Sequence, residues 1–326
     1  MASSGDLDGM ATANRQLIDV KRRRLLAASV LSVVAPGVLA AVPAAVSTSR
    51  SGARAAGYRI ATPDRVGTET LLALGVAPVA AGARSIYTAM GGTPVLPETV
   101  ADIGYWFEPN LEVMRELQVD LIVIEAMSLN LKDVLQRVAP IFVMEIYSGE
   151  GHPDFIERSS AEMFRLAHSI GREDAARRYR GALDSRLAAL RDEMRAYARR
   201  PAFIAQLDPS GQSVFLYAKN CVTWDVMQRV GFDNAWTGAT NTYGCVQVGI
   251  DQLAGAPDAD IFYIDYGDEA KAALVQLAQS RVWNSLPMVR ERRVYPIAPF
   301  DPLGALPTAI QFADSFRAAV IARGRG

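Results

Sequence analysis

Side chains that commonly hold metals or assist nucleophiles are scarce in this sequence. Its 326 residues include two cysteines, Cys221 and Cys245, and two histidines, His152 and His168. These four residues are too few for a zinc ribbon, an iron–sulfur cluster or a histidine-rich metal cage. We therefore expect no resident metal and no intrinsic cofactor.

The motifs of the common hydrolases are also absent from the sequence. It contains no Gly-x-Ser-x-Gly, no His-Glu-x-x-His and no phosphate-binding glycine loop. A Ser-His-Asp triad would have to use His152, in a predicted loop, or His168, in a predicted helix. Both positions are typical of surface residues, so we expect a protein that is not an enzyme. An extracytoplasmic hydrolase is the less favoured alternative.

Composition narrows the class of protein further. Hydrophobic residues make up 50% of the chain and charged residues 21%, a balance typical of a packed globular protein. The net charge is −1, whereas a nucleic-acid-binding protein needs a basic surface to contact phosphates. We expect no nucleic-acid partner.

The first 56 residues have the pattern of an export signal. A polar stretch leads to Lys21-Arg22-Arg23-Arg24, and an apolar run rich in alanine and valine follows. The adjacent arginines and the mildly hydrophobic run are typical of a Tat-type signal peptide, although a single transmembrane anchor is an alternative. We expect the protein to be exported to the periplasm.

Short apolar runs alternate with helical patterns along most of the remaining chain. Asp120–Glu125, with the sequence DLIVIE, is typical of a buried parallel strand, and Leu131–Val138 has helical periodicity. The predicted strands are residues 58–61, 76–81, 120–125, 141–146, 202–207, 213–217, 260–266 and 293–297. The predicted helices outside the central segment are residues 69–74, 111–117, 131–138, 222–230, 269–278 and 308–322. This alternation predicts an α/β fold with helices covering parallel sheets.

One central segment, from Pro153 to Arg200, is helical almost throughout, with a break at Gly171. Its part from Glu173 to Arg199 has mixed charges on one face and apolar residues on the other, and a long helix of this kind spans rather than folds back. We therefore predict two Rossmann-like α/β lobes joined by a single long helix. The predicted organisation is residues 1–56 for the signal and linker, 57–152 for the N-terminal lobe, 153–200 for the helical segment and 201–326 for the C-terminal lobe.

The two predicted lobes share a short pattern of acidic residues. In the first, Glu112 opens a short helix and Asp120 precedes a buried strand; in the second, Asp251 and Asp260 occupy the same places in the same order. Acidic residues favour helix starts in general, so helix capping is one explanation. The repetition in both lobes indicates pseudo-symmetry.

Several colinear segments resemble one known family. They are Asp102-Ile-Gly with Glu108-Pro-Asn-Leu-Glu112, Asp120-Leu-Ile-Val-Ile, Arg137-Val-Ala-Pro140, Gly231-Phe-Asp-Asn-Ala-Trp236, Ile250-Asp251-Gln-Leu, and Val282-Trp283-Asn-Ser-Leu-Pro-Met-Val289 with Arg293-Val-Tyr. Together they resemble the periplasmic iron-siderophore binding proteins, closest to the FhuD-like ferric-hydroxamate group. The resemblance runs from about Tyr58 to Ala322. It implies a two-lobed protein that holds a ferric siderophore in a cleft and passes it to the inner-membrane permease of an ABC importer.

A site of this kind needs aromatic walls and a few polar anchors, because the siderophore's own oxygens already satisfy the iron. The resemblance therefore implies that Fe(III) is bound only through the siderophore. It places ligand-binding residues at Tyr87, Met90, Trp106, Ser128, Tyr243 and Asp301.

The sequence departs from the family at three of these positions. FhuD-like proteins have an arginine where this chain has Trp106, a tyrosine where it has Ser128 and a tryptophan where it has Tyr243. Trp106 cannot supply the charge-assisted fork of a guanidinium. A ferric hydroxamate is the first expectation for the ligand. A non-hydroxamate siderophore, cobalamin or haem are alternatives.

Two further expectations concern the protein's partner and its cysteines. The resemblance implies that Glu112 and Asp251 dock onto the two halves of the permease, and we expect the binding protein to be a monomer. Cys221 and Cys245 lie in one predicted lobe of an exported protein, so a disulfide bond between them is one alternative and two buried thiols are the other.

Overall fold

The computed structural model describes residues 57–147, 154–197 and 199–324. The predicted export signal in residues 1–56 and the loop histidine His152 lie outside the described residues. No helix in the described ranges is long and apolar enough to cross a membrane.

The first lobe, residues 57–147, contains a five-stranded parallel sheet in the order β3-β2-β1-β6-β7. The strands are β1 (Ile60–Thr62), β2 (Ala80–Ala81), β3 (Ala101–Asp102), β6 (Leu121–Glu125) and β7 (Ile141–Met144). The helices are α2 (Arg65–Ala73), α3 (Arg84–Ala89), α4 (Leu111–Glu116), the 3-10 helix η1 (Ala126–Leu131) and α5 (Lys132–Leu135). A two-stranded hairpin, β4 (Gly104–Tyr105) with β5 (Glu108–Pro109), follows β3. The middle of β6 is fully buried, as expected of a strand covered on both faces.

The second lobe, residues 199–324, contains a mixed five-stranded sheet in the order β10-β9-β8-β11-β12. The strands are β8 (Ala202–Leu207), β9 (Ser213–Tyr217), β10 (Cys245–Gly249), β11 (Asp260–Ile264) and β12 (Val294–Ile297). β8, β11 and β12 are parallel, whereas β9 is antiparallel to both β8 and β10. The helices are α8 (Val222–Val230), the 3-10 helix η2 (Ile250–Gly255), α9 (Asp268–Gln279), α10 (Arg281–Ser285), α11 (Pro287–Arg290) and α12 (Leu306–Arg323).

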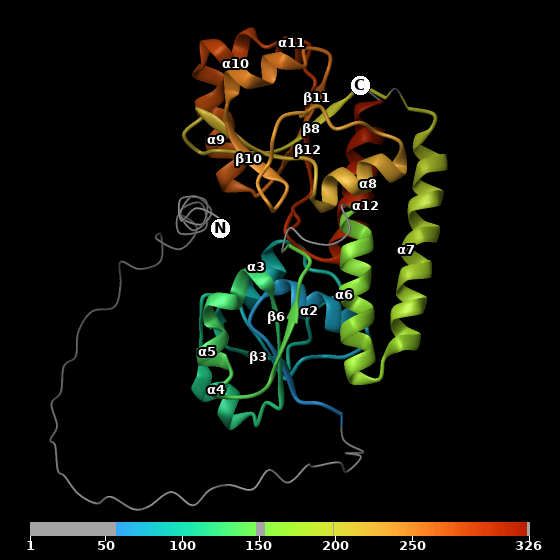
Figure 1. Cartoon of the computed structure of the whole chain (residues 1–326). Coiled ribbons are helices and arrows are strands. Elements are labelled where there is room, and N and C mark those ends of the chain that lie inside the picture. Colours follow the sequence, from blue (N-terminus) through green and yellow to red (C-terminus); the bar gives the residue numbers. More distant parts are fainter. Residues whose placement is uncertain (1–56, 148–153, 198, 325–326) are drawn as a thin grey trace, which may run out of the picture. The chain divides into compact units, whose positions relative to one another are not determined.

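Two antiparallel helices connect the lobes: α6 (Phe155–Ile170) and α7 (Glu173–Met194). They run side by side in Figure 1 and pack against each other. Gly171 caps α6 with a φ of 68°, a left-handed conformation that glycine adopts readily, and the chain reverses there. α7 is the longer of these two helices. It contacts α2 of the first lobe and both α8 and α12 of the second, so it packs along both lobes.

The expected α/β class is confirmed, and several predicted elements are corrected. The helix predicted over residues 131–138 is instead η1 followed by α5, and the strand predicted over 76–81 is only Ala80–Ala81. Helix α3 and strands β3, β4, β5 and β10 were not predicted. β3, β4 and β5 have two residues each, too few for an alternating pattern to be read.

Candidate functional site

The loops after the strands of the first sheet carry most of the predicted ligand residues. All five strands are parallel, so their carboxyl ends lie at one edge of the sheet, where open α/β sheets bind ligands. Arg65 follows β1, Tyr87 lies on α3 after β2, Trp106 lies in the hairpin after β3, and Ser128 lies on η1 after β6. The topology therefore gathers these positions at one edge.

Ser128 belongs to a buried carboxyl network at this edge. It is 2% exposed, and its hydroxyl donates to Asp64 Oδ2 over 3.2 Å. The same oxygen accepts the Glu125 N–H at 2.7 Å, and Glu125 Oε1 accepts the Tyr147 N–H at 2.9 Å. Burial raises the pKa of Asp64, and it raises the pKa of Glu125 to about 7 with a contribution from Asp64. The Ser128 hydroxyl thus links η1 to the loop that follows β1.

Arg65 joins predicted site residues of the two lobes. Its guanidinium carbon lies 5.0 Å from the centre of the Tyr87 ring, and its Nε lies 4.0 Å from Asp301 Oδ2. Nε donates to Glu69 Oε2 over 3.2 Å, and Nη2 donates to Gln311 Oε1 over 3.2 Å. The structure therefore brings Tyr87 of the first lobe and Asp301 of the second lobe to the same guanidinium.

Glu69 and Gln311 extend this contact between the lobes. Glu69 is fully buried and accepts hydrogen bonds from the Ala305 N–H and from Thr308 Oγ1, the latter at 3.0 Å from Oε2. The Gln311 amide donates to the Met90 carbonyl over 2.9 Å, which ties the end of α3 to α12. We refer to the five polar residues of this contact as the junction cluster: Arg65, Glu69, Asp301, Thr308 and Gln311.

Tyr243 reaches the same region through Tyr147. The two rings lie 6.2 Å apart, and the Tyr147 hydroxyl donates to the Gly304 carbonyl over 2.7 Å, three residues after Asp301. The Tyr266 hydroxyl donates to the Phe300 carbonyl over 2.8 Å in the same loop. Burial holds the pKa of Tyr147 and of Tyr266 well above the ordinary value, so both phenols stay protonated.

Trp106 lies in an aromatic hairpin. It is half-buried, and its ring meets Phe107 edge to face with 5.4 Å between centres. Phe107 in turn stacks on Tyr105 at 5.5 Å, and each of these two residues is 40% exposed. In the part of the chain that the structure describes, no ring contact or hydrogen bond joins Trp106 to the junction cluster. Among the described residues, the ring contacts and hydrogen bonds do not link Trp106 to Tyr87, Tyr243 or Asp301.

The two predicted docking acids are exposed at the starts of short helices. Glu112 lies in the first turn of α4, which Asn110 caps by accepting the Glu112 and Val113 N–H groups. Asp251 lies in the first turn of η2, and its Oδ2 accepts a hydrogen bond from Gln252 over 3.1 Å. Each lobe thus presents one of the two predicted docking carboxylates to solvent.

The disulfide bond considered between Cys221 and Cys245 is corrected: the structure does not join these two described residues. Both side chains are buried. The Cys221 thiol donates to the Ala218 carbonyl over 2.9 Å, and Cys245 Sγ lies 3.4 Å from Asn241 Oδ1. Burial raises the pKa of Cys221, which keeps its thiol protonated.

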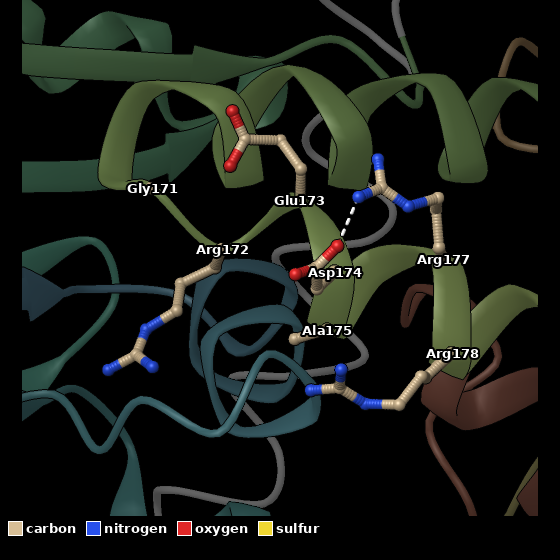
Figure 2. A pocket seen from close by; sticks show the side chains of 7 residues that line it. All are labelled: Gly171, Arg172, Glu173, Asp174, Ala175, Arg177 and Arg178. Carbon is tan, nitrogen blue, oxygen red and sulfur yellow. Dashed lines mark hydrogen bonds and ion pairs between the residues drawn. The ribbon is translucent and has the colours of Figure 1, made fainter.

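Two surface hollows lie away from these residues. One of about 500 Å³ surrounds the turn between α6 and α7, and Figure 2 shows Arg172 and Arg178 extending on one side of it while Arg177 pairs with Asp174. A second, of about 400 Å³, adjoins the end of α2 and shares Arg172 and Arg178. Neither contains a predicted ligand residue, and the first has no aromatic side chain. Their lining does not suit a bulky chelate.

The class of protein is given by a family profile that matches most of the chain. The chain matches the profile of the periplasmic binding protein family over residues 60–299 and belongs to this family. It is a family of substrate-binding proteins that act outside the cytoplasm, and not a family of enzymes.

Within this family, the chain is similar to several siderophore-binding proteins. It is 28% identical over 294 residues to the iron(3+)-hydroxamate-binding protein FhuD of Escherichia coli (strain K12), which covers 90% of this chain and 94% of that protein. Its fold matches that of the siderophore-binding protein FhuD of Vibrio cholerae, solved with Fe3+–Desferal, at a TM-score of 0.75 and 24% identity over 82% of this chain and 99% of that one. It also matches the triscatecholate siderophore binding protein FeuA of Bacillus subtilis, at a TM-score of 0.62 and 18% identity over 81% and 92% of the two chains.

Sequence reasoning missed Arg65, Tyr147 and Tyr266. All three follow the carboxyl ends of parallel strands, at β1, β7 and β11. That position was the available signal, because a charged residue or a tyrosine directly after a buried strand points to the ligand-binding edge of a sheet.

Proposed function

We propose that this protein captures a ferric siderophore of the hydroxamate type outside the cytoplasm and delivers it to the inner-membrane permease of an ABC importer. The observation that carries the proposal is the gathering of Tyr87, Tyr243 and Asp301, from separate parts of both lobes, around Arg65 and Tyr147. The extensive sequence similarity to a hydroxamate-binding protein supports the same ligand class.

The chemistry of the proposed site suits a complete chelate better than a bare metal ion. Its phenols stay protonated because burial raises their pKa, and a protonated phenol is a poor ligand for iron. The Arg65 guanidinium, whose Nη1 has no hydrogen-bond partner among the described residues, can donate a hydrogen bond to an oxygen of a chelate. Iron is therefore cargo, held by the siderophore, and the protein needs no cofactor of its own.

Trp106 supplies a different part of the proposed site. With Tyr105 and Phe107 it offers exposed aromatic surface beside the carboxyl edge of the first sheet. An apolar face of the chelate can pack there, while Ser128 holds the neighbouring loops in place.

Delivery follows from the placement of the two exposed acids. Glu112 and Asp251 lie on different lobes, so a pseudo-symmetric protein can present one carboxylate to each half of a two-fold permease. We further propose that a Tat-type signal in residues 1–56 exports the chain to the periplasm. The mature protein acts as a monomer, with lobes at residues 57–152 and 201–326 joined by residues 153–200.

The ligand that copurifies from a siderophore-replete culture tests this function. We expect a ferric charge-transfer absorption band and a hydroxamate chelate by mass spectrometry. A corrin band would show that the ligand is cobalamin, and a Soret band would show that it is haem; either would contradict the siderophore proposal. Turnover of ester or peptide substrates would favour a hydrolase.

A further inference from the structure

The first turn of α6 is fixed to the second lobe by two carboxyl side chains. α6 packs against α8 (Figure 1), and Asp225 of α8 is 8% exposed. Its Oδ2 accepts the Ile156 N–H at 2.8 Å. Asp154, which caps α6, accepts a hydrogen bond at Oδ2 from Arg229 Nη2 over 2.8 Å. These bonds attach the start of the connection between the lobes to helix α8.

Arg158, on the same turn of α6, reaches both lobes. Its buried guanidinium donates from Nε to the Ile146 carbonyl over 3.0 Å and from Nη2 to the Asn220 carbonyl over 3.1 Å. Ile146 follows β7 of the first lobe, and Asn220 precedes α8 of the second. A movement of this turn is therefore transmitted to both lobes.

Asp154 and Asp225 also share a hydrogen bond. An ionised carboxylate only accepts hydrogen bonds, so this bond requires one proton between the two groups. Burial, together with the bond to Asp154, raises the pKa of Asp225 to about 7. Burial opposes the ionisation of Asp154 too, but the bond with Asp225 and the Arg229 guanidinium hold the pKa of Asp154 below its usual value. The pair therefore keeps one proton in acid and loses it near neutral pH.

Arg229 offers Asp225 a second arrangement. Its Nε forms an ion pair with Asp225 Oδ1 at 3.4 Å, but this buried nitrogen makes no hydrogen bond among the described residues. Arg229 Nη2 lies 3.3 Å from Glu157 Oε1 as well, so three carboxyl groups share one guanidinium. When Asp225 ionises, repulsion by Asp154 and attraction by Arg229 Nε both favour a shift of its carboxylate from Asp154 to Arg229.

The other charged groups of this region have partners of their own. Glu157 binds Arg180 of α7 at 2.7 Å, and Arg180 binds Asp184 at 2.9 Å. The Cys221 thiol at the start of α8 is neutral, because burial raises its pKa. Helix α12 packs on α8, and its charged residues pair elsewhere: Asp314 with Arg186, Arg317 with Glu193 and Arg323 with Asp260. A change of charge near neutral pH in this region is therefore a change at Asp225.

We propose that Asp154 and Asp225 form a proton-operated clamp between the helical connection and the second lobe. In mildly acidic medium the shared proton holds the first turn of α6 to α8, and the lobes keep a fixed angle. In alkaline medium the pair is ionised, Asp225 moves toward Arg229, and the lobes move more freely. The clamp lies outside the candidate ligand site and does not depend on which ligand the protein binds.

Asp225→Asn tests the clamp, because an amide can donate to Asp154 at every pH, as the protonated carboxyl does. Urea denaturation at about pH 5.5 and about pH 8.5 gives the unfolding constants of the wild type and the variant. Folding raises the pKa of Asp225, so its proton stabilises the wild type in acid, and this contribution is lost as the pH rises through 7. Relative to Asp225→Asn, the wild-type unfolding constant should therefore rise at least about tenfold between the two pH values. The comparison cancels the contribution of Glu125, which both proteins share.

The stability of the variant also separates the clamp from a simple ion pair. At about pH 8.5, Asp225→Asn should be at least as stable as the wild type. If Asp225 serves only as a partner of Arg229, the variant is the less stable protein at both pH values. That result would overturn the proposal.

Spin labels measure the freedom of the lobes directly. Lys132→Cys on α5 and Lys271→Cys on α9 place one label at an exposed position of each lobe. Because Cys221 and Cys245 are buried, the folded protein is labelled at the introduced cysteines. The distribution of distances between the labels should be broader in alkaline than in acidic medium, and with Asp225→Asn it should be equally narrow in both.

Asp314→Asn is the matched control, since it removes an ion pair with Arg186 between α12 and α7 and leaves the clamp intact. Its difference in stability from the wild type should be the same at both pH values. A distance distribution that does not respond to pH, or a response that persists in Asp225→Asn, would contradict the clamp. If Asp225→Asn does not fold, Asp154→Asn takes its place, because asparagine also caps helices, and the same loss of pH dependence is expected.

Discussion

Replacing Glu69 tests whether the junction cluster stabilises the protein. Glu69 is fully buried on α2, and its contacts are with Arg65 on the same helix and with Ala305 and Thr308 of the second lobe. Glu69→Leu removes the carboxylate and puts an apolar side chain of similar size in its place. Glu69→Gln keeps the shape and one acceptor oxygen but removes the charge.

The structure sets the expected size of each effect. Without Glu69, the Arg65 guanidinium stays 90% buried with Asp301, 4.0 Å away, as its nearest carboxylate. Removal of one partner of a buried ion pair costs about 3–5 kcal/mol, so Glu69→Leu should lower the free energy of unfolding by that amount. Glu69→Gln should lower it by about 1–3 kcal/mol, the cost of losing hydrogen bonds to a charged group.

Urea denaturation followed by circular dichroism measures both variants against the wild type. The matched control is Asp174→Ala, which removes an ion pair with Arg177 whose partners are 76% and 63% exposed. Surface pairs of this kind contribute about 0–1 kcal/mol. The reasoning is refuted if Glu69→Leu costs no more than this control.

Three further predictions concern ligand binding, transport and pH. Trp106→Ala should weaken ferric hydroxamate binding by at least about 1 kcal/mol and reduce fluorescence quenching on titration; unchanged affinity and quenching would remove Trp106 from the site. The double variant Glu112→Ala, Asp251→Ala should keep the ligand Kd and the melting temperature but lower uptake and transporter-stimulated ATP hydrolysis in reconstituted vesicles; normal transport would return both acids to helix capping. Burial raises the pKa of Glu125 from 4.5 to about 7, so its protonated form stabilises the fold below about pH 4.5 and this contribution is lost as the pH rises through 7. Relative to Glu125→Gln, wild-type stability in urea melts should therefore fall between these pH values, by at most about 3 kcal/mol, and a constant difference would contradict the shift.

The second lobe was the easier one to predict from sequence. The predicted strands 202–207 and 213–217 and the predicted helix 222–230 match β8, β9 and α8 residue for residue. Each is a continuous apolar or amphipathic pattern with a clear end, such as Gly231 with a φ of 83° after α8. Helix α3 has no such signal: it is six residues long, and it follows Ala83, which has a left-handed conformation and no side-chain cap.

The candidate site was predictable only in part. The resemblance predicted Tyr87, Tyr243 and Asp301 as ligand residues, and the structure places Tyr87 and Asp301 beside Arg65 and Tyr243 beside Tyr147. The contact of Arg65 with Asp301 could not be predicted, since it joins residues far apart in sequence and depends on how the two lobes pack. The thiols of Cys221 and Cys245 illustrate the same limit, because proximity in a lobe does not specify bonding.

Helix α12 is the last element of the chain, so the junction cluster can form only at the end of synthesis. It contacts α2, α6, α7 and α8, all of which precede it in the chain. Thr308 and Gln311 near its start bind the first lobe, and Phe316 further along packs on Phe232 and Phe262 of the second. Either lobe can begin to collapse while the chain is still growing, but their mutual contact waits for residues 306–323. In a chain that ends before Leu306, Arg65 and Glu69 would lose their partners on α12. Apolar surface of the second lobe that packs against Phe316 would be exposed at the same time.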